Sequence, residues 1–73
     1  MNIWIRNTED LGRIVRNVRK LQKLSQDDLA GMAGTGRRFI VDLEKGKQTV
    51  QFGKVLRVLR TLGVSVSSTR KWY

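Results

Sequence analysis

Residues 25–46, SQDDLAGMAGTGRRFIVDLEKG, carry the clearest signals of regular structure in the chain. Ser25 is followed three residues later by Asp28, which resembles the capping box that marks the first turn of a helix. Gly34 supplies a residue that tolerates the left-handed conformation in which short helices end. The pattern therefore predicts a helix over 26–33.

A second short helix is predicted immediately afterwards, over 37–45. Thr35 and Gly36 are its candidate N-cap positions, and Gly46 stops it. When two short helices are joined by three or four residues, the second can lie in a DNA major groove about 12 Å wide while the first crosses the backbone. Base contacts then require long donor side chains on the outward face near the start of the second helix, where the sequence has Arg37 and Arg38.

Amphipathic segments flank this pair on both sides. One runs from about 9 to 22, with Thr8 as a candidate N-cap, and the other from about 50 to 62, after Thr49. We expect the core to consist of the apolar stripes of all four segments: Leu11, Ile14, Val15, Val18, Leu21, then Leu29, Ala30, Met32, Ala33, then Phe39, Ile40, Leu43, and finally Phe52, Val55, Leu56, Leu59 and Leu62.

The two ends of the chain alternate apolar and polar side chains, over 2–6 and 64–67, as strands do. A single strand is not stable alone, so we expect it to pair across a dimer interface. The aromatic residues near the ends are expected to pack at an interface: Trp4, Trp72 and Tyr73.

The predicted fold is therefore all-α: a small helix-turn-helix bundle of four to five helices with a short terminal β-strand at a dimer interface. Residues 1–73 form a single domain, with a helix-turn-helix core over about 11–63 and tails over 1–7 and 64–73.

Charge is the strongest feature of the composition. Fifteen Lys and Arg against six Asp and Glu give a net charge of +9. Glu44 is the last acid, and seven cations follow it: Lys45, Lys47, Lys54, Arg57, Arg60, Arg70 and Lys71. This imbalance favours a polyanion, because each neutralised phosphate releases counterions. A basic surface that is merely solvated, or that binds an anionic membrane, is the alternative.

The residues missing from the chain argue against an enzyme. It has no histidine and no cysteine, and most of its six acids lie at helix starts or are expected to be paired. No nucleophile and base can be assembled from what remains, so we expect neither catalysis, cofactor nor metal. Apolar runs are too short to span a membrane, and 1–6 do not resemble a signal peptide, so we expect a cytoplasmic, nucleoid-associated protein.

Residues 11–66 resemble the Xre/Cro class of helix-turn-helix regulators, which includes the phage repressors. The likeness is carried by Leu24-Ser25-Gln26, Leu29-Ala30, Gly34, Ile40, Leu43-Glu44-Lys45-Gly46-Lys47 and Leu62-Gly63-Val64. More narrowly, residues 34–40 and 53–56 with the strand-like tail are similar to HipB-type antitoxins, which are found beside HipA-type serine/threonine kinase toxins. The resemblance implies a homodimer on double-stranded operator DNA, with a HipA-like kinase as a further partner.

The resemblance also implies which residues contact DNA. Gln26 matches the residue that clamps a phosphate at the start of the first helix of the pair, and Thr35 or Gly36 would place a second phosphate contact. The base-reading positions are Arg37 and Arg38; Val41 can meet a thymine methyl, and the backbone contacts are Lys45 and Lys47.

Two further positions have structural interpretations. Asp42 stands where relatives often carry a polar or basic reader, so it either accepts from a cytosine amine or pairs with Arg38. Glu44 matches an acid that forms a buried pair with an arginine of the first helix, and Arg19, at the edge of the apolar stripe, is that arginine here.

The function that follows is a sequence-specific repressor that is also the antitoxin of a toxin–antitoxin operon. A plain repressor without a toxin is one alternative, and a basic module that binds an acidic protein is another. For the basic face of the first helix we favour a solvated surface over contacts with a kinase or flanking DNA: Arg13, Arg16, Lys20 and Lys23.

Overall fold

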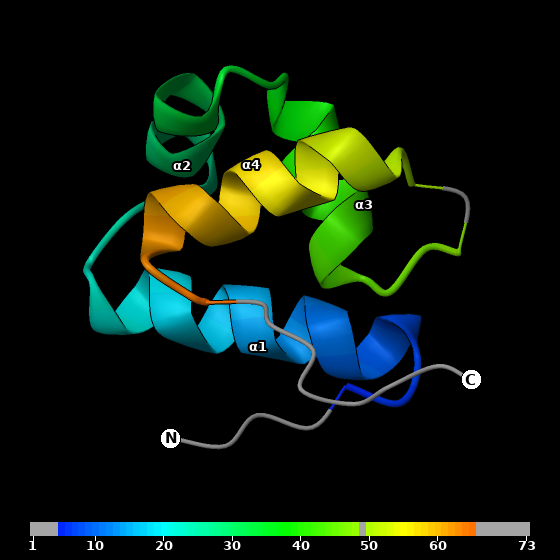
Figure 1. Ribbon diagram of the computed structural model, residues 1–73. Helices are drawn as coiled ribbons and strands as arrows, with labels where there is room; N and C mark the ends of the chain where they lie inside the picture. Colours follow the sequence, from blue (N-terminus) through cyan, green and yellow to red (C-terminus); the bar gives the residue numbers. More distant parts are fainter. Residues whose placement is uncertain (1–4, 49, 66–73) are drawn as a thin grey trace.

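The computed structural model of the chain describes residues 5–48 and 50–65 (Figure 1). These residues form four helices, α1 Thr8–Leu21, α2 Gln26–Ala33, α3 Arg37–Glu44 and α4 Phe52–Leu62. In Figure 1, α1 lies below and α4 crosses in front of α3. Both α1 and α2 pack against α3 and α4, which gives the small all-α helix-turn-helix bundle that the sequence predicts.

The predicted terminal strand falls mostly on residues that lie outside this description, 2–4 and 66–67. The adjoining described residues, 5–6 and 64–65, are not in a strand. The expected packing of Trp4, Trp72 and Tyr73 likewise lies outside the described residues.

Side-chain caps explain where α1 and α2 begin, but not where α3 begins. Asn7, and not Thr8 as predicted, caps α1, because its side chain accepts a 2.7 Å hydrogen bond from the Asp10 backbone N–H. Thr8 is the first helical residue, and its hydroxyl donates to the Gly46 carbonyl at 2.7 Å. The predicted capping box of α2 is confirmed, and α3 begins after Gly36 without a side-chain cap.

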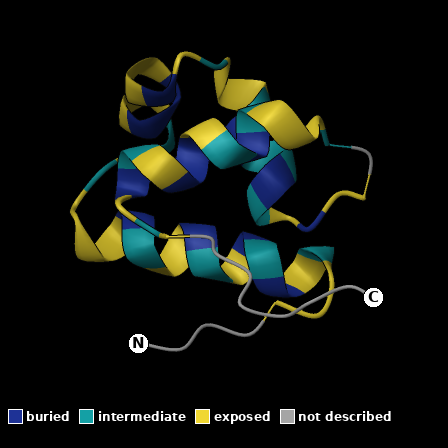
Figure 2. Cartoon of the chain, viewed as in Figure 1, coloured by how far each residue is buried: buried dark blue, intermediate teal, exposed yellow. Residues whose placement is uncertain are grey.

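The core lies where the four helices face one another (Figure 2). Ten apolar side chains are buried there: Val15, Leu29, Ala30, Ala33, Ile40, Leu43, Val55, Val58, Leu59 and Leu62. Nine of these belong to the predicted stripes, whereas Val58 does not. Each buried Val, Leu or Ile side chain of this set stabilises the fold by roughly 1.5–3 kcal/mol.

Three predicted core residues are exposed instead: Leu21, Met32 and Phe52. The buried face of α4 runs from Val55 through Val58 and Leu59 to Leu62, so it begins one turn after Phe52. On α1 the buried side is centred on Gly12, Val15 and Arg19, which leaves Leu21 outside.

Two glycines allow α1 to approach the end of α3 closely. A Cβ on Gly12 would lie 2.6 Å from the carbonyl oxygens of Leu43 and Glu44. Gly46 has a φ of +81°, and a Cβ there would lie 2.9 Å from the Glu9 Cα. Backbone therefore meets backbone at this contact, which sets the position of α3 on α1.

Candidate nucleic-acid interface

The start of α3 carries the predicted base-reading residues on its outer surface. The Arg37 side chain is 63% exposed and the Arg38 side chain 82% exposed. Lys45 and Lys47 are exposed at and beyond the end of α3. Val41 and Asp42, which lie between Arg38 and Lys45 in the sequence, are half-buried. The predicted contact residues of α3 therefore share one accessible surface.

Carboxylates lie near both arginines. The Arg37 Nε is 3.4 Å from the Asp27 Oδ1, and the Arg38 Nε is 3.4 Å from the Asp42 Oδ1. The Lys47 Nζ donates to the other Asp42 oxygen at 3.5 Å. Exposed ion pairs of this length contribute at most about 1 kcal/mol, so a phosphate or a base edge can displace them. Of the two roles left open for Asp42, this geometry favours pairing with Arg38.

A buried network behind this surface holds the helix pair in place. The predicted pair is confirmed: Arg19 Nε and Nη2 donate to the two Glu44 oxygens at 2.6 and 3.0 Å. A further bond runs from Arg19 Nη1 to the Leu24 carbonyl at 2.7 Å. Because the Glu44 carboxylate accepts hydrogen bonds from the Arg19 guanidinium, the pKa of Arg19 is raised. The network joins α1, the α1–α2 loop and α3.

Gln26, the predicted phosphate clamp, belongs to the same network. It is the first residue of α2, half-buried, and its Nε2 donates to Glu44 Oε1 at 3.2 Å. One amide hydrogen is thereby committed to the protein, which fixes the direction of the side chain. The second amide hydrogen makes no hydrogen bond within 5–48 and 50–65, so it is available to another acceptor.

Thr35 and Gly36 lie at the turn between α2 and α3. The turn is made by Gly34, with a φ of +71°. The Thr35 hydroxyl donates to the Gly36 carbonyl at 3.3 Å, and Gly36 is exposed. No side chain caps α3, so its first backbone N–H groups are left without a side-chain partner at the predicted second phosphate position.

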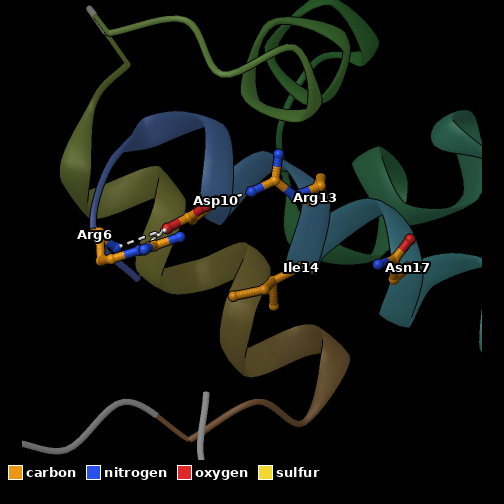
Figure 3. Close-up of a pocket in the computed structure, with 5 residues that line it drawn as sticks. All are labelled: Arg6, Asp10, Arg13, Ile14 and Asn17. Atoms are coloured by element: carbon orange, nitrogen blue, oxygen red, sulfur yellow. Dashed lines mark hydrogen bonds and ion pairs between the residues drawn. The ribbon is translucent and has the colours of Figure 1, made fainter. Parts of the chain in front are cut away.

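Sequence reasoning missed one polar cluster, on α1. Asp10 is buried and accepts from the backbone and side chain of Arg6, both at 3.1 Å, and from Arg13 Nη2 (Figure 3). These hydrogen bonds, first from the Arg6 backbone and then from its side chain, lower the Asp10 pKa. With Ile14 and Asn17 these residues line a shallow hollow that contains none of the predicted DNA contacts. Only the i, i+3 and i, i+4 spacing of opposite charges signals this cluster in the sequence.

The predicted basic face of the first helix is exposed: Arg13, Arg16 and Lys20 on α1, and Lys23 in the turn after it. Arg13 pairs with Asp10, whereas the other three form no ion pair within the described residues.

Over 5–48 and 50–65 no group of three metal-ligating side chains comes together. None of the helices α1 to α4 is both long and apolar enough to cross a bilayer.

Two short helices joined at a left-handed glycine, with exposed arginines at the start of the second, define a helix-turn-helix domain of the DNA-binding class. The helix-turn-helix family model HTH_3 matches residues 15–68. The chain is 63% identical over 62 residues to an uncharacterized HTH-type transcriptional regulator, y4mF, of Sinorhizobium fredii (strain NBRC 101917 / NGR234), covering 85% of this chain and 82% of that one. The chain therefore belongs to the Xre-type helix-turn-helix family of transcriptional regulators.

Solved structures share the fold. The structure of a HipA-HipB-O2-O3 complex contains a chain that matches with a TM-score of 0.82 at 19% identity, over 94% of this chain and 97% of that chain. The restriction-modification controller protein C.AhdI from Aeromonas hydrophila matches with a TM-score of 0.71 at 26% identity, over 80% and 84% of the two chains. The first of these likenesses shows that the chain shares its fold with a chain of the HipA-HipB-O2-O3 complex.

Proposed function

We propose that this regulator is a sequence-specific repressor that binds a palindromic operator as a homodimer and inserts α3 into the major groove. The observation that carries the proposal is the exposure of Arg37 and Arg38 at the start of α3, with side chains 63% and 82% accessible. Each guanidinium can donate two hydrogen bonds to a guanine, which discriminates by about 1–3 kcal/mol against another base.

A dimer follows from the size of the reading surface. One α3 of eight residues contacts only a few base pairs, too few for useful affinity alone. Two copies on half-sites about 34 Å apart would double the contacts on one face of the duplex. As a DNA-binding protein it would act in the cytoplasm, at the nucleoid, by binding and not by catalysis.

We further propose an antitoxin role, in which the same protein neutralises a HipA-like serine/threonine kinase. Similarity to a chain of the HipA-HipB-O2-O3 complex over nearly its whole length supports this. A plain regulator without a toxin is the second candidate, and the similarity to the controller C.AhdI favours it. An adjacent kinase-like gene, and co-purification of its product with this chain, would distinguish the antitoxin from the plain regulator.

Footprinting on the DNA upstream of the protein's own gene tests the repressor. We expect protection of two half-sites related by a two-fold axis, and two protein chains per site in sedimentation of the complex. Contact with roughly six to ten phosphates would give a slope of about −5 to −9 for log K against log salt. Binding of one chain to a site without symmetry would contradict the proposal. If the chain binds only an acidic protein and no duplex, it is an interaction module and not a repressor.

A further inference from the structure

Arg57 belongs to α4, outside the helix-turn-helix pair, but its side chain reaches the turn of that pair. Its Nη1 atom lies 3.7 Å from the position that a Cβ would take on Gly34. Gly34 is the left-handed residue that ends α2, and Arg37 begins α3 three residues later. The exposed guanidinium of Arg57 therefore lies beside the start of the proposed reading helix.

Nothing acidic within the described residues neutralises this guanidinium. All six acids of the chain are described, and each makes its contacts elsewhere: Glu9 with Thr8, Asp10 with Arg6 and Arg13, Asp27 with Arg37, Asp28 with Ser25, Asp42 with Arg38 and Lys47, and Glu44 with Arg19 and Gln26. The Arg57 side chain also makes no hydrogen bond with the residues described. A guanidinium with uncommitted donors suits a phosphate, which it can bind through two parallel hydrogen bonds.

A second cation of α4 lies close to α3. The Lys54 Nζ lies 5.7 Å from the centroid of the Phe39 ring. On the helical wheel of α3, Phe39 flanks the outward face on one side, whereas Arg37 and Glu44 lie toward the other. The Lys54 ammonium therefore lies at one edge of the outward face of α3, whereas Asp27 and Gln26 of α2 contact the other edge. The α4 helix itself packs against α1 and α2.

The two walls of a major groove are both phosphate backbones, so a helix inserted into it has phosphates on both sides. Gln26 of α2 serves one side in the proposed function. We propose that Arg57, beside the turn that precedes α3, binds a further phosphate, which makes α4 a DNA-contacting element in addition to the helix pair. This inference rests on the proposed DNA-binding function and adds a residue to it.

Another role for Arg57 would be structural, because a cation near the C-terminus of α2 is favoured by the helix dipole. The two roles differ in what they change. A structural role affects the melting temperature, whereas a phosphate contact changes the salt dependence of DNA binding. Arg60 offers a matched control, because it is an exposed arginine of α4 that borders a separate hollow with Leu56 and Val64.

The experiment measures binding of wild type, Arg57→Gln, Arg57→Lys and Arg60→Gln to a random-sequence duplex and to the protein's own upstream duplex at several salt concentrations. For Arg57→Gln we expect the slope of log K against log salt to become shallower by about 0.9 per chain on both duplexes. Arg57→Lys should keep most of the slope, and Arg60→Gln should keep the wild-type slope. Melting temperatures of all four proteins are measured alongside.

Equal slopes of log K against log salt for Arg57→Gln and Arg60→Gln would overturn the inference. If Arg57→Gln lowers the melting temperature but leaves the slope unchanged, the role of Arg57 is to stabilise the C-terminus of α2. If wild type itself binds neither duplex, the proposed function fails. If wild type binds and Arg38→Ala weakens binding to the upstream duplex while Arg57→Gln changes nothing, only the present inference fails.

Discussion

Arg19 and Glu44 form a buried ion pair that joins α1 to the last residue of α3 through two hydrogen bonds, of 2.6 and 3.0 Å. The two side chains are only 10% and 5% exposed. Because Glu44 also accepts a hydrogen bond from Gln26, the same carboxylate sets the position of α3 relative to α1 and to the start of α2.

Removal of one partner of this pair should destabilise the fold strongly. Arg19→Met leaves a buried carboxylate without its cation, for which we expect a loss of about 3–5 kcal/mol in the free energy of unfolding, measured with urea. Arg16→Met, on the exposed side of the same helix, should change it by less than about 0.5 kcal/mol. The double variant Arg19→Met/Glu44→Leu should be less destabilised than Arg19→Met. Equal effects of Arg19→Met and Arg16→Met would show that the pair contributes nothing.

At the contact between α1 and α3, adding one methyl group to Gly12 should destabilise the fold. Gly12→Ala places a Cβ 2.6 Å from two backbone carbonyl oxygens, so the helices must separate, at a cost of about 1–3 kcal/mol. Gly31→Ala is the matched control, because no atom lies within 4 Å of its Cβ position and alanine favours a helix by about 1 kcal/mol. Thermal unfolding should therefore shift downward for Gly12→Ala and upward for Gly31→Ala. A Gly12→Ala variant as stable as wild type would contradict the backbone contact.

Asp42 should restrain the cations of the DNA-binding surface. Asp42→Asn removes the partner of Arg38 and Lys47, so we expect tighter binding to a random-sequence duplex and a steeper salt dependence. Glu9→Gln removes the same charge from a residue that forms no ion pair with Arg38 or Lys47, and should have a smaller effect on both quantities. If Asp42 instead accepts from a cytosine, Asp42→Asn will leave random-duplex binding unchanged and weaken only the operator complex.

Stability should fall in acid. The pKa values of Asp10 and Asp28 lie below their usual 3.8 in the folded chain, because each carboxylate accepts a backbone hydrogen bond, from Arg6 and from Ser25. Their ionised forms therefore stabilise the fold above about pH 3.8, and this contribution is lost as the pH falls through their folded pKa values. We expect circular dichroism to show a melting temperature that declines below about pH 4, and a weaker decline in Asp10→Asn/Asp28→Asn. An identical decline in wild type and double variant would assign the acid sensitivity to other groups.

Local signals made the helix pair predictable. Ser25 and Asp28 cap α2 through bonds that span only three residues, and Gly34 ends it, so no knowledge of the rest of the chain was needed. The pairing of Arg19 with Glu44, which are 25 residues apart, came from the family resemblance and not from spacing.

Other features depend on how the helices meet. Leu21 and Phe52 lie on apolar stripes but are exposed, because the neighbouring helices do not extend over them. An apolar stripe does not show which of its residues another helix will bury. The closeness of Gly12 to α3 and the position of Arg57 beside Gly34 are contacts between distant segments. The periodicity of apolar residues in the sequence does not predict these two contacts.

In the proposed function, Arg37 and Arg38 read bases from the start of α3. The most direct test is the ratio of affinities for the protein's own upstream duplex and for a random duplex, measured for wild type, Arg37→Ala and Arg38→Ala at one salt concentration. We expect each substitution to lower this ratio by about 5- to 150-fold, corresponding to about 1–3 kcal/mol, while Arg16→Ala leaves it unchanged. A ratio that survives both substitutions would contradict base reading by α3.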